Sequence, residues 1–372
     1  MRFPKNVNTR SHFFEVCESG KKLILFGAGR LCMRSLNTFL RGREVRYICD
    51  NNPRLQGTRL FGIDIVPPAR LRDENPDDTM ILITSGQVKE IIAEIESIAA
   101  FDYLSANVLM SKVLTAVALD LFEHKEELVQ AEALLCDEMS KHIFIEAVYR
   151  RLVGDNDFAD LELPEASQYI LPAFFSDSSS CVEGEIIIDC GAYTGDSLHS
   201  FVEVFECTLK KYYAFEPTPE TRETLIKKAH QYSQRAYAPQ IVVMPYGVSD
   251  KPEVVDFYVT NKPDGSFIIQ SKEFVWHSER QTIETVRLDD VIPADEKITL
   301  IKMDVEGSEY PALIGAEKII KTHKPRLGIS IYHRGDDYYR IALLIKKWVP
   351  EYQFAVRHHT KSHFDTVLYA WV

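Results

Sequence analysis

Short runs of apolar residues alternate with stretches of helical spacing along most of the chain. In the first part of the sequence these runs are residues 23–26, 45–49 and 80–83, and the first leads directly into Gly27-Ala28-Gly29. Unbroken apolar strands that alternate with helices are typical of a parallel sheet covered on both faces. The pattern therefore predicts a small Rossmann-like α/β domain over residues 1–105.

A second series of apolar runs begins at Glu185 and continues to the end of the sequence. Seven of them predict strands: residues 186–188, 212–215, 241–244, 298–303, 327–331, 352–356 and 366–372. The last two are joined by a short polar loop, which predicts a terminal hairpin. We expect a doubly wound, seven-stranded α/β sheet over residues 181–372, interrupted by a polar, β-rich excursion before the fourth strand.

Residues 106–180 lie between the two series and carry no strand signal. Glu, Leu, Ala and Lys are frequent up to Gly154, with apolar residues at helical spacing. Pro164, Pro172 and a run of serines then punctuate the sequence. These features predict a helical connector followed by a loop.

Composition restricts the partners more than the fold. With 43 basic and 55 acidic residues the formal net charge is −12, which disfavours a nucleic-acid partner.

The seven cysteines are scattered without C-x-x-C spacing, so they predict neither a disulfide framework nor a structural zinc site. The sequence starts without a signal-peptide pattern, and no stretch approaches the length of a membrane span. We expect a cytoplasmic protein.

Polar residues follow the predicted strands of the second series. Asp189, Glu216 and Asp304 each end or follow an apolar run, Glu306 comes two residues later, and His333 follows the fifth strand. In an open α/β sheet, ligands bind outside the carboxyl ends of the strands. The sequence therefore predicts a binding site at this edge of the sheet.

The loop after the first of these strands has the pattern D-x-G-x-x-x-G. Gly191 and Gly195 allow tight turns, so a cofactor can approach the main chain. Neither G-x-G-x-x-G nor a P-loop lysine is present, which favours a ligand without a phosphate to bind. An acidic loop suits the amino and sulfonium groups of S-adenosylmethionine. Glu216, 27 residues after Asp189, is placed to accept both hydroxyls of a ribose.

Four segments of the second series stand out: I-D-C-G-A-Y-T-G-D at 188–196, A-F-E-P at 214–217, G-V-S-D at 247–250 and I-K-M-D-V-E-G-S-E at 301–309. Together they resemble the FkbM family of methyltransferases. Their order and spacing also match, and the resemblance extends over about residues 185–372. It implies a class I methyltransferase fold, S-adenosylmethionine as cofactor and methyl transfer to a hydroxyl, typically on a sugar, polyketide or other secondary metabolite.

The resemblance also implies which residues contact the cofactor. Residues 189–195 would line its methionine part, Glu216 would bind the ribose, and residues 247–249 would lie beside the adenine. The cofactor-binding residues expected in this way are Asp189, Gly191, Ala192, Tyr193, Thr194, Gly195, Ser197, Glu216, Pro217, Gly247, Val248, Ser249 and Asp304.

The expected catalytic residues are His333, Asp304 and Glu306. His333 is the candidate proton acceptor, because an unperturbed imidazole has a pKa of about 6.5. Asp304 would position the acceptor or orient the imidazole. The same three residues offer donors for a divalent metal, but no second histidine is tied to them in the sequence, so we expect catalysis without a metal. A hydrogen-bonded histidine at a strand end is the alternative for His333.

The N-terminal part resembles nucleotide-binding units attached to sugar acetyltransferases and sugar methyltransferases. The matching residues are F-G-A-G at 26–29, C-D-N-N-P at 49–53, Gly57 and F-G-I-D-I at 61–65. Cys32 stands where a dinucleotide fingerprint has its third glycine, which disfavours NAD. The resemblance implies either a nucleotide-sugar site or a scaffold that binds nothing.

The favoured function is an O-methyltransferase that acts on a sugar, nucleotide sugar or related metabolite. A nicotinamide-dependent sugar oxidoreductase is a first alternative, but it needs a complete glycine fingerprint and neither loop supplies one. A noncatalytic binding protein with a methyltransferase fold is a second, and the intact Asp189, Gly191, Glu216 and His333 weigh against it.

Overall fold

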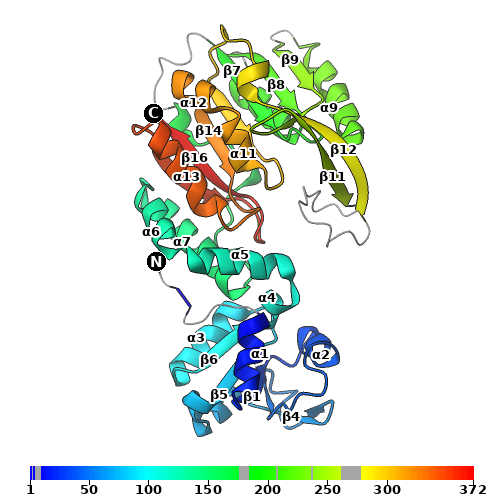
Figure 1. The fold of residues 1–372 in the computed structure, drawn as a ribbon, viewed down its shortest axis with the longest axis vertical. Coiled ribbons are helices and arrows are strands. Elements are labelled where there is room, and N and C mark those ends of the chain that lie inside the picture. Colours follow the sequence, from blue (N-terminus) through cyan, green and yellow to red (C-terminus); the bar gives the residue numbers. More distant parts are fainter. Residues whose placement is uncertain (2, 5–9, 176–183, 207, 236–237, 261–277) are drawn as a thin grey trace. The chain divides into compact units, whose positions relative to one another are not determined.

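The computed structural model describes residues 1, 3–4, 10–175, 184–206, 208–235, 238–260 and 278–372, and Figure 1 shows their fold. The chain divides into two compact units. The first comprises residues 1–129, 144–161 and 361–363, and the second comprises residues 130–143, 162–360 and 364–372. Each unit is built around a sheet of its own.

The sheet of the first unit has the strand order β3-β4-β2-β1-β5-β6. Its strands are β1 (Lys22–Phe26), β2 (Ile48–Cys49), β3 (Arg59–Leu60), β4 (Ile63–Val66), β5 (Thr79–Ile83) and β6 (Asp102–Ser105). Neighbouring strands are parallel, except that β3 and β4 are antiparallel. The apolar pattern predicts β1, β2 and β5, but it does not predict β3, β4 and β6, which are short and carry polar residues.

Both faces of this sheet are buried. The helices of the unit include α1 (Arg10–Glu18), α2 (Arg30–Asn37) and α3 (Val88–Ile98), with the 3-10 helices η1 (Pro68–Asp73) and η2 (Pro76–Asp78). Leu23 and Leu25 of β1 belong to one apolar cluster, whereas Ile24 and Phe26 belong to another. Successive side chains of a strand point to opposite faces, so the continuous apolar run of β1 supplies two cores.

Helices occupy the segment that the sequence predicts as a connector. They are α4 (Ala106–Met110), α5 (Lys112–Glu123), α6 (Lys125–Ala133) and α7 (Glu138–Val153), and the 3-10 helices η3 (Glu165–Ser167) and η4 (Pro172–Phe175) follow. The division between the two units falls within this segment, because residues 130–143 group with the second unit and residues 144–161 with the first. None of the helices in the described part of the chain combines the length and apolar character that a membrane crossing requires.

The second unit contains a seven-stranded sheet with the order β15-β16-β14-β13-β7-β8-β9. Its strands are β7 (Glu185–Cys190), β8 (Leu209–Phe215), β9 (Gln240–Met244), β13 (Leu300–Met303), β14 (Arg326–Ser330), β15 (Gln353–His358) and β16 (Thr366–Trp371). Only β16 is antiparallel to its neighbours β14 and β15. This is the doubly wound sheet with a terminal hairpin that the sequence predicts.

Helices connect the strands of this sheet. They are α8 (Asp196–Phe205), α9 (Pro219–Tyr232), α10 (Leu288–Val291), α11 (Glu309–Ile314), α12 (Glu317–His323) and α13 (Asp337–Trp348). The apolar face of α8 is buried through Leu198, Phe201, Val202 and Phe205. Two of its aromatic rings stack on each other, and Phe201 also contacts Tyr212 of β8. The helical spacing of this segment therefore corresponds to its packing against the sheet.

The excursion between β9 and β13 forms a small sheet of its own. It consists of β10 (Gly247–Val248), β11 (Glu253–Thr260) and β12 (Ser278–Val286), in the order β10-β12-β11. In the large sheet, the strand order reverses at β7, which has β8 on one side and β13 on the other. Ligand sites of open α/β sheets lie at such a reversal, beyond the carboxyl ends of the strands.

Candidate functional site

A buried ion pair joins the two strands at this reversal. Asp189 of β7 and Lys302 of β13 are register partners, and both are almost completely buried. The Nζ of Lys302 lies 3.0 Å from Oδ1 of Asp189, and Oδ2 of Asp189 accepts a hydrogen bond of 2.5 Å from the hydroxyl of Tyr212. Burial by itself lowers the pKa of Lys302, but Asp189 and Asp304 more than reverse this effect. The lysine therefore stays charged at neutral pH.

The loop after β7 is held close to the main chain of β13. Nζ of Lys302 donates to the carbonyl oxygen of Gly191 at 2.6 Å. Gly191 has a φ of +81°, and a Cβ on this residue would lie 1.8 Å from the carbonyl oxygen of Asp304. No other residue fits here, because both the backbone angle and the space exclude a side chain. The sequence predicted a tight turn at this glycine, and the structure confirms it.

Glu216 follows β8 and faces the same loop. Its Oε2 accepts from the backbone N–H of Tyr193 at 3.0 Å, and its Oε1 accepts from the N–H of Thr218 and the hydroxyl of Thr221, both at 2.8 Å. These donors fix the carboxylate, while Oε2 keeps a second lone pair for a ligand hydroxyl. Glu216 is therefore placed so that it can accept a hydrogen bond from a ribose hydroxyl. The contact itself stays a prediction.

The remaining expected cofactor residues lie on the neighbouring elements. Ala192, Tyr193 and Thr194 are in the loop, and Ser197 is in the first turn of α8 after Gly195, which has a φ of +81°. Tyr193 is 52% exposed, so its ring is available to a ligand. Pro217 follows Glu216. Gly247 and Val248 form β10, and Ser249 follows it, with its N–H bonded to Val286.

Asp189 is placed differently from the expected contact with the methionine part. Its exposed fraction is 0%, and its oxygens face Lys302 and Tyr212. It lies beneath the loop and supports it. Asp189 therefore adds no exposed negative charge to the loop, and its direct contact with a cofactor is a prediction that this geometry does not favour.

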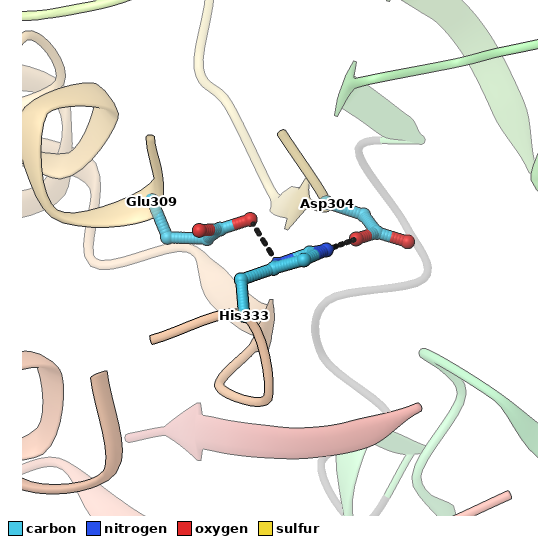
Figure 2. A group of neighbouring side chains, drawn as sticks. All are labelled: Asp304, Glu309 and His333. Carbon is cyan, nitrogen blue, oxygen red and sulfur yellow. Dashed lines mark ion pairs between the residues drawn. The ribbon is translucent and has the colours of Figure 1, made fainter. Parts of the chain in front are cut away.

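A second group of polar side chains follows β13 and β14, as Figure 2 shows. His333 lies between carboxylates: its Nδ1 is 2.9 Å from Oε1 of Glu309, and its Nε2 is 3.6 Å from Oδ1 of Asp304 and 3.3 Å from Oε2 of Glu306. The side chains of His333 and Glu309 are 5% and 0% exposed, whereas those of Asp304 and Glu306 are 23% and 33% exposed. The three residues predicted as catalytic are therefore adjacent.

The charges of this group affect one another strongly. Burial lowers the pKa of His333, but Glu309 and Glu306 reverse this effect and hold its pKa well above the ordinary value. Burial raises the pKa of Asp304, but Lys302 and His333 outweigh burial and lower it overall. For Glu306, burial and the nearby carboxylates of Asp304 and Glu309 leave the pKa raised. An imidazolium ion facing carboxylates is thus the preferred state of the ligand-free cluster at neutral pH.

The sequence predictions assign no role to three residues that shape this site. Lys302 and Glu309 lie within the segment 301–309 that resembles the FkbM family, and Tyr169 belongs to a segment predicted as loop. The hydroxyl of Tyr169 donates to Oδ2 of Asp304 at 3.0 Å and lies 2.9 Å from the hydroxyl of Ser330. The spacing of the acidic residues after β13 could have indicated Glu309, but nothing local connects Tyr169 with this edge of the sheet.

His358 and His359, near the start of the hairpin loop, are buried. His359 lies 3.0 Å from the hydroxyl of Tyr369, and burial lowers its pKa to about 4.

In the first unit, the two oxygens of Asp50 accept from the N–H groups of Ala28 and Asn52 at 2.7 and 2.8 Å. That carboxylate supports the glycine turn, and a nucleotide site there stays a prediction.

The strand order and the glycine turn define a class I methyltransferase fold in the second unit. Residues 189–358 match the family model described as the methyltransferase FkbM domain. The matched residues lie in the second unit and agree with the resemblance of the four segments to the FkbM family. This match supports S-adenosylmethionine as the cofactor.

Solved structures include a methyltransferase FkbM from Methylobacillus flagellatus. It is 23% identical, with a TM-score of 0.61 over 98% of this chain and 94% of that one, so the fold is shared over nearly the whole length. A UDP-D-quinovosamine 4-dehydrogenase from Vibrio fischeri is 23% identical over 23% of this chain and 76% of that one, with a TM-score of 0.20. Fibrillarin from Aeropyrum pernix is 11% identical over 51% and 67%, with a TM-score of 0.31. No curated protein matches the sequence.

The buried pair allows a direct test of what supports the cofactor loop. Replacing Lys302 by Met leaves Asp189 buried without a counter-ion, which should cost about 3–5 kcal/mol of stability. The further change Asp189→Asn should restore part of that loss, because it removes the uncompensated charge. Urea unfolding of the two variants and the wild type measures both effects.

Lys227→Met is the matched control, because Lys227 and its partner Glu223 are 69% and 70% exposed. This change should lower the free energy of unfolding by less than about 1 kcal/mol. If Lys302→Met were as stable as Lys227→Met, the buried pair would not support the loop in the way described.

Proposed function

We propose that the second unit transfers the methyl group of S-adenosylmethionine to a hydroxyl of a sugar, nucleotide sugar or related metabolite. One observation carries the proposal: the glycine loop and the carboxylates after β13 share one edge of the sheet. The carbonyl oxygen of Asp304 lies against Gly191, while its side chain reaches toward His333. A methyl donor on the loop would therefore lie beside a group of residues that can bind a hydroxyl.

The reaction needs little more than alignment and a place for one proton. The acceptor oxygen forms a bond to the methyl carbon as the bond from carbon to sulfur breaks, and the bonding electrons remain on sulfur. The sulfonium charge is lost, and the hydroxyl proton passes to a base. Asp304 and Glu306 are partly exposed carboxylates at the position where the hydroxyl would approach.

The surroundings of His333 favour a role other than that of proton acceptor. Both of its ring nitrogens are buried, and each lies within 4 Å of a carboxylate oxygen. A raised pKa also means that the imidazole already carries its proton at neutral pH. We therefore assign His333 the task of positioning Asp304 and Glu306, and the direct proton transfer to its ring stays a prediction that the geometry does not favour.

Binding of the demethylated product tests the choice of cofactor. S-adenosylhomocysteine should raise the melting temperature of the protein, because a ligand at 100 times its Kd stabilises the native state by about 2.7 kcal/mol. We expect a shift on the order of 5 °C by differential scanning fluorimetry. NAD at the same concentration should give none. A shift with NAD and none with S-adenosylhomocysteine would favour the oxidoreductase instead.

A substitution at Glu216 tests the ribose contact. Glu216→Ala should weaken the binding of S-adenosylhomocysteine by about 2–3 kcal/mol, because charged hydrogen bonds to the hydroxyls are lost. Isothermal titration calorimetry measures the affinity, and circular dichroism shows whether the variant is folded. Glu223→Ala, an exposed change on α9, is the control and should bind like the wild type. Equal affinity of a folded Glu216→Ala variant would move the ribose site elsewhere.

A further inference from the structure

The cluster after β13 has the geometry of a cation site. We propose that Asp304, Glu306 and His333 bind a divalent metal ion, with Glu309 as the residue that orients the imidazole. The sequence favours catalysis without a metal, because no second histidine accompanies His333. In the structure, two carboxylates lie on the side of Nε2 and can act as further ligands in place of a second histidine. A third carboxylate lies on the side of Nδ1.

The distances around Nε2 are those of neighbouring ligands of one ion. Oδ1 of Asp304 and Oε2 of Glu306 lie 3.6 and 3.3 Å from this nitrogen. Ligands at right angles around an ion with bonds of 2.0–2.3 Å lie about 3 Å apart. Both distances exceed this value, so an ion between these atoms would draw the two oxygens closer to Nε2.

Glu309 lies on the opposite side of the ring, as Figure 2 shows. Its Oε1 is 2.9 Å from Nδ1 and also accepts from the backbone N–H of Val305 at 2.8 Å. Histidine ligands of metals commonly give their second ring N–H to a carboxylate, which fixes the tautomer and makes the other nitrogen a better ligand. The completely buried Glu309 has this position, and it is a positioning residue rather than a ligand.

Two observations indicate that the cluster can take up further positive charge. Oε2 of Glu309 forms no hydrogen bond within the part of the chain that the structure describes, although it is buried. Buried polar atoms are nearly always satisfied, so orphaned ones need an explanation. Three carboxylates also face one imidazole, while the nearby Lys302 is paired with Asp189 and Arg334 with Asp336.

The donor set restricts the kind of ion. Two carboxylates and one imidazole form a mixed oxygen and nitrogen set that suits Mn²⁺, Mg²⁺ or Zn²⁺ and does not suit Cu⁺. The partial exposure of Asp304 and Glu306 leaves room for further ligands from outside the protein. As a statement about catalysis, the inference rests on the proposed function: an acceptor hydroxyl bound to the ion would lose its proton more readily. Binding of the ion does not depend on that function.

The full-length protein, stripped with a chelator and dialysed, is titrated with Mn²⁺ alone while electron paramagnetic resonance measures the free ion. Calorimetric titrations with Mg²⁺ and Zn²⁺ accompany it. We expect one site per chain. Glu306→Gln, a partly exposed change that should leave the fold intact, and His333→Ala should each weaken binding at least 10-fold. Glu309→Gln should weaken it about 10–100-fold, the usual effect of losing a residue that orients a metal ligand.

Glu317→Gln is the control, because Glu317 pairs only with the exposed Lys321 of the same helix among the contacts that the structure gives for it. It should bind the ion like the wild type. The inference is overturned if the folded wild type binds none of the three ions at millimolar concentration, or if binding is unaffected by both Glu306→Gln and His333→Ala.

A parallel titration with S-adenosylhomocysteine separates the two proposals. If the product binds but no ion does, the metal site is wrong and the methyltransferase proposal stands. If an ion binds at Glu306 and His333 but the product does not bind, the metal site stands and the proposed function is wrong.

Discussion

The buried ion pair between Asp189 and Lys302 is the interaction on which the rest of the functional edge depends. Moving two charges out of water costs several kcal/mol for each ion, and the cost is offset only if the remaining hydrogen-bonding groups are satisfied. Here Tyr212 donates to the carboxylate, and the ammonium donates to the carbonyl of Gly191. The pair can exist only where β7 and β13 are neighbours, so it links the reversal of strand order to the position of the cofactor loop.

The same lysine connects this loop to the cluster after β13. Its Nζ lies 5.3 Å from the centre of the Tyr169 ring, and the hydroxyl of that tyrosine donates to Asp304. A single buried cation thus influences the loop on one side and the first carboxylate of the cluster on the other. Because Lys302 and His333 keep Asp304 ionised, the cluster keeps a negative charge beside the expected position of a sulfonium ion.

The sequence predicted the architecture of the second unit well, because its strands are long apolar runs and its helices have clear periodicity. It also predicted the proximity of Asp304, Glu306 and His333, since the carboxyl ends of neighbouring parallel strands meet at one edge. It could not predict what these residues do. The contact of Tyr169 with Asp304 joins positions 135 residues apart, and the burial that changes the pKa of His333 arises from several elements at once.

Two local features explain why the sequence predicts no role for Lys302 and Glu309. A lysine within an apolar strand resembles an interruption of the pattern, and only the register with β7 shows that it faces a buried carboxylate. A glutamate at the start of a helix is ordinarily explained by its interaction with the helix dipole. Here Glu309 is completely buried and lies against the imidazole, which the dipole does not require. Such departures from local rules are expected at functional sites, because the energy that they cost must be recovered from distant contacts or from a ligand. Oε2 of Glu309 has no hydrogen-bond donor among the described residues, and three carboxylates face one imidazole, so the proposed ion would supply positive charge that this arrangement lacks.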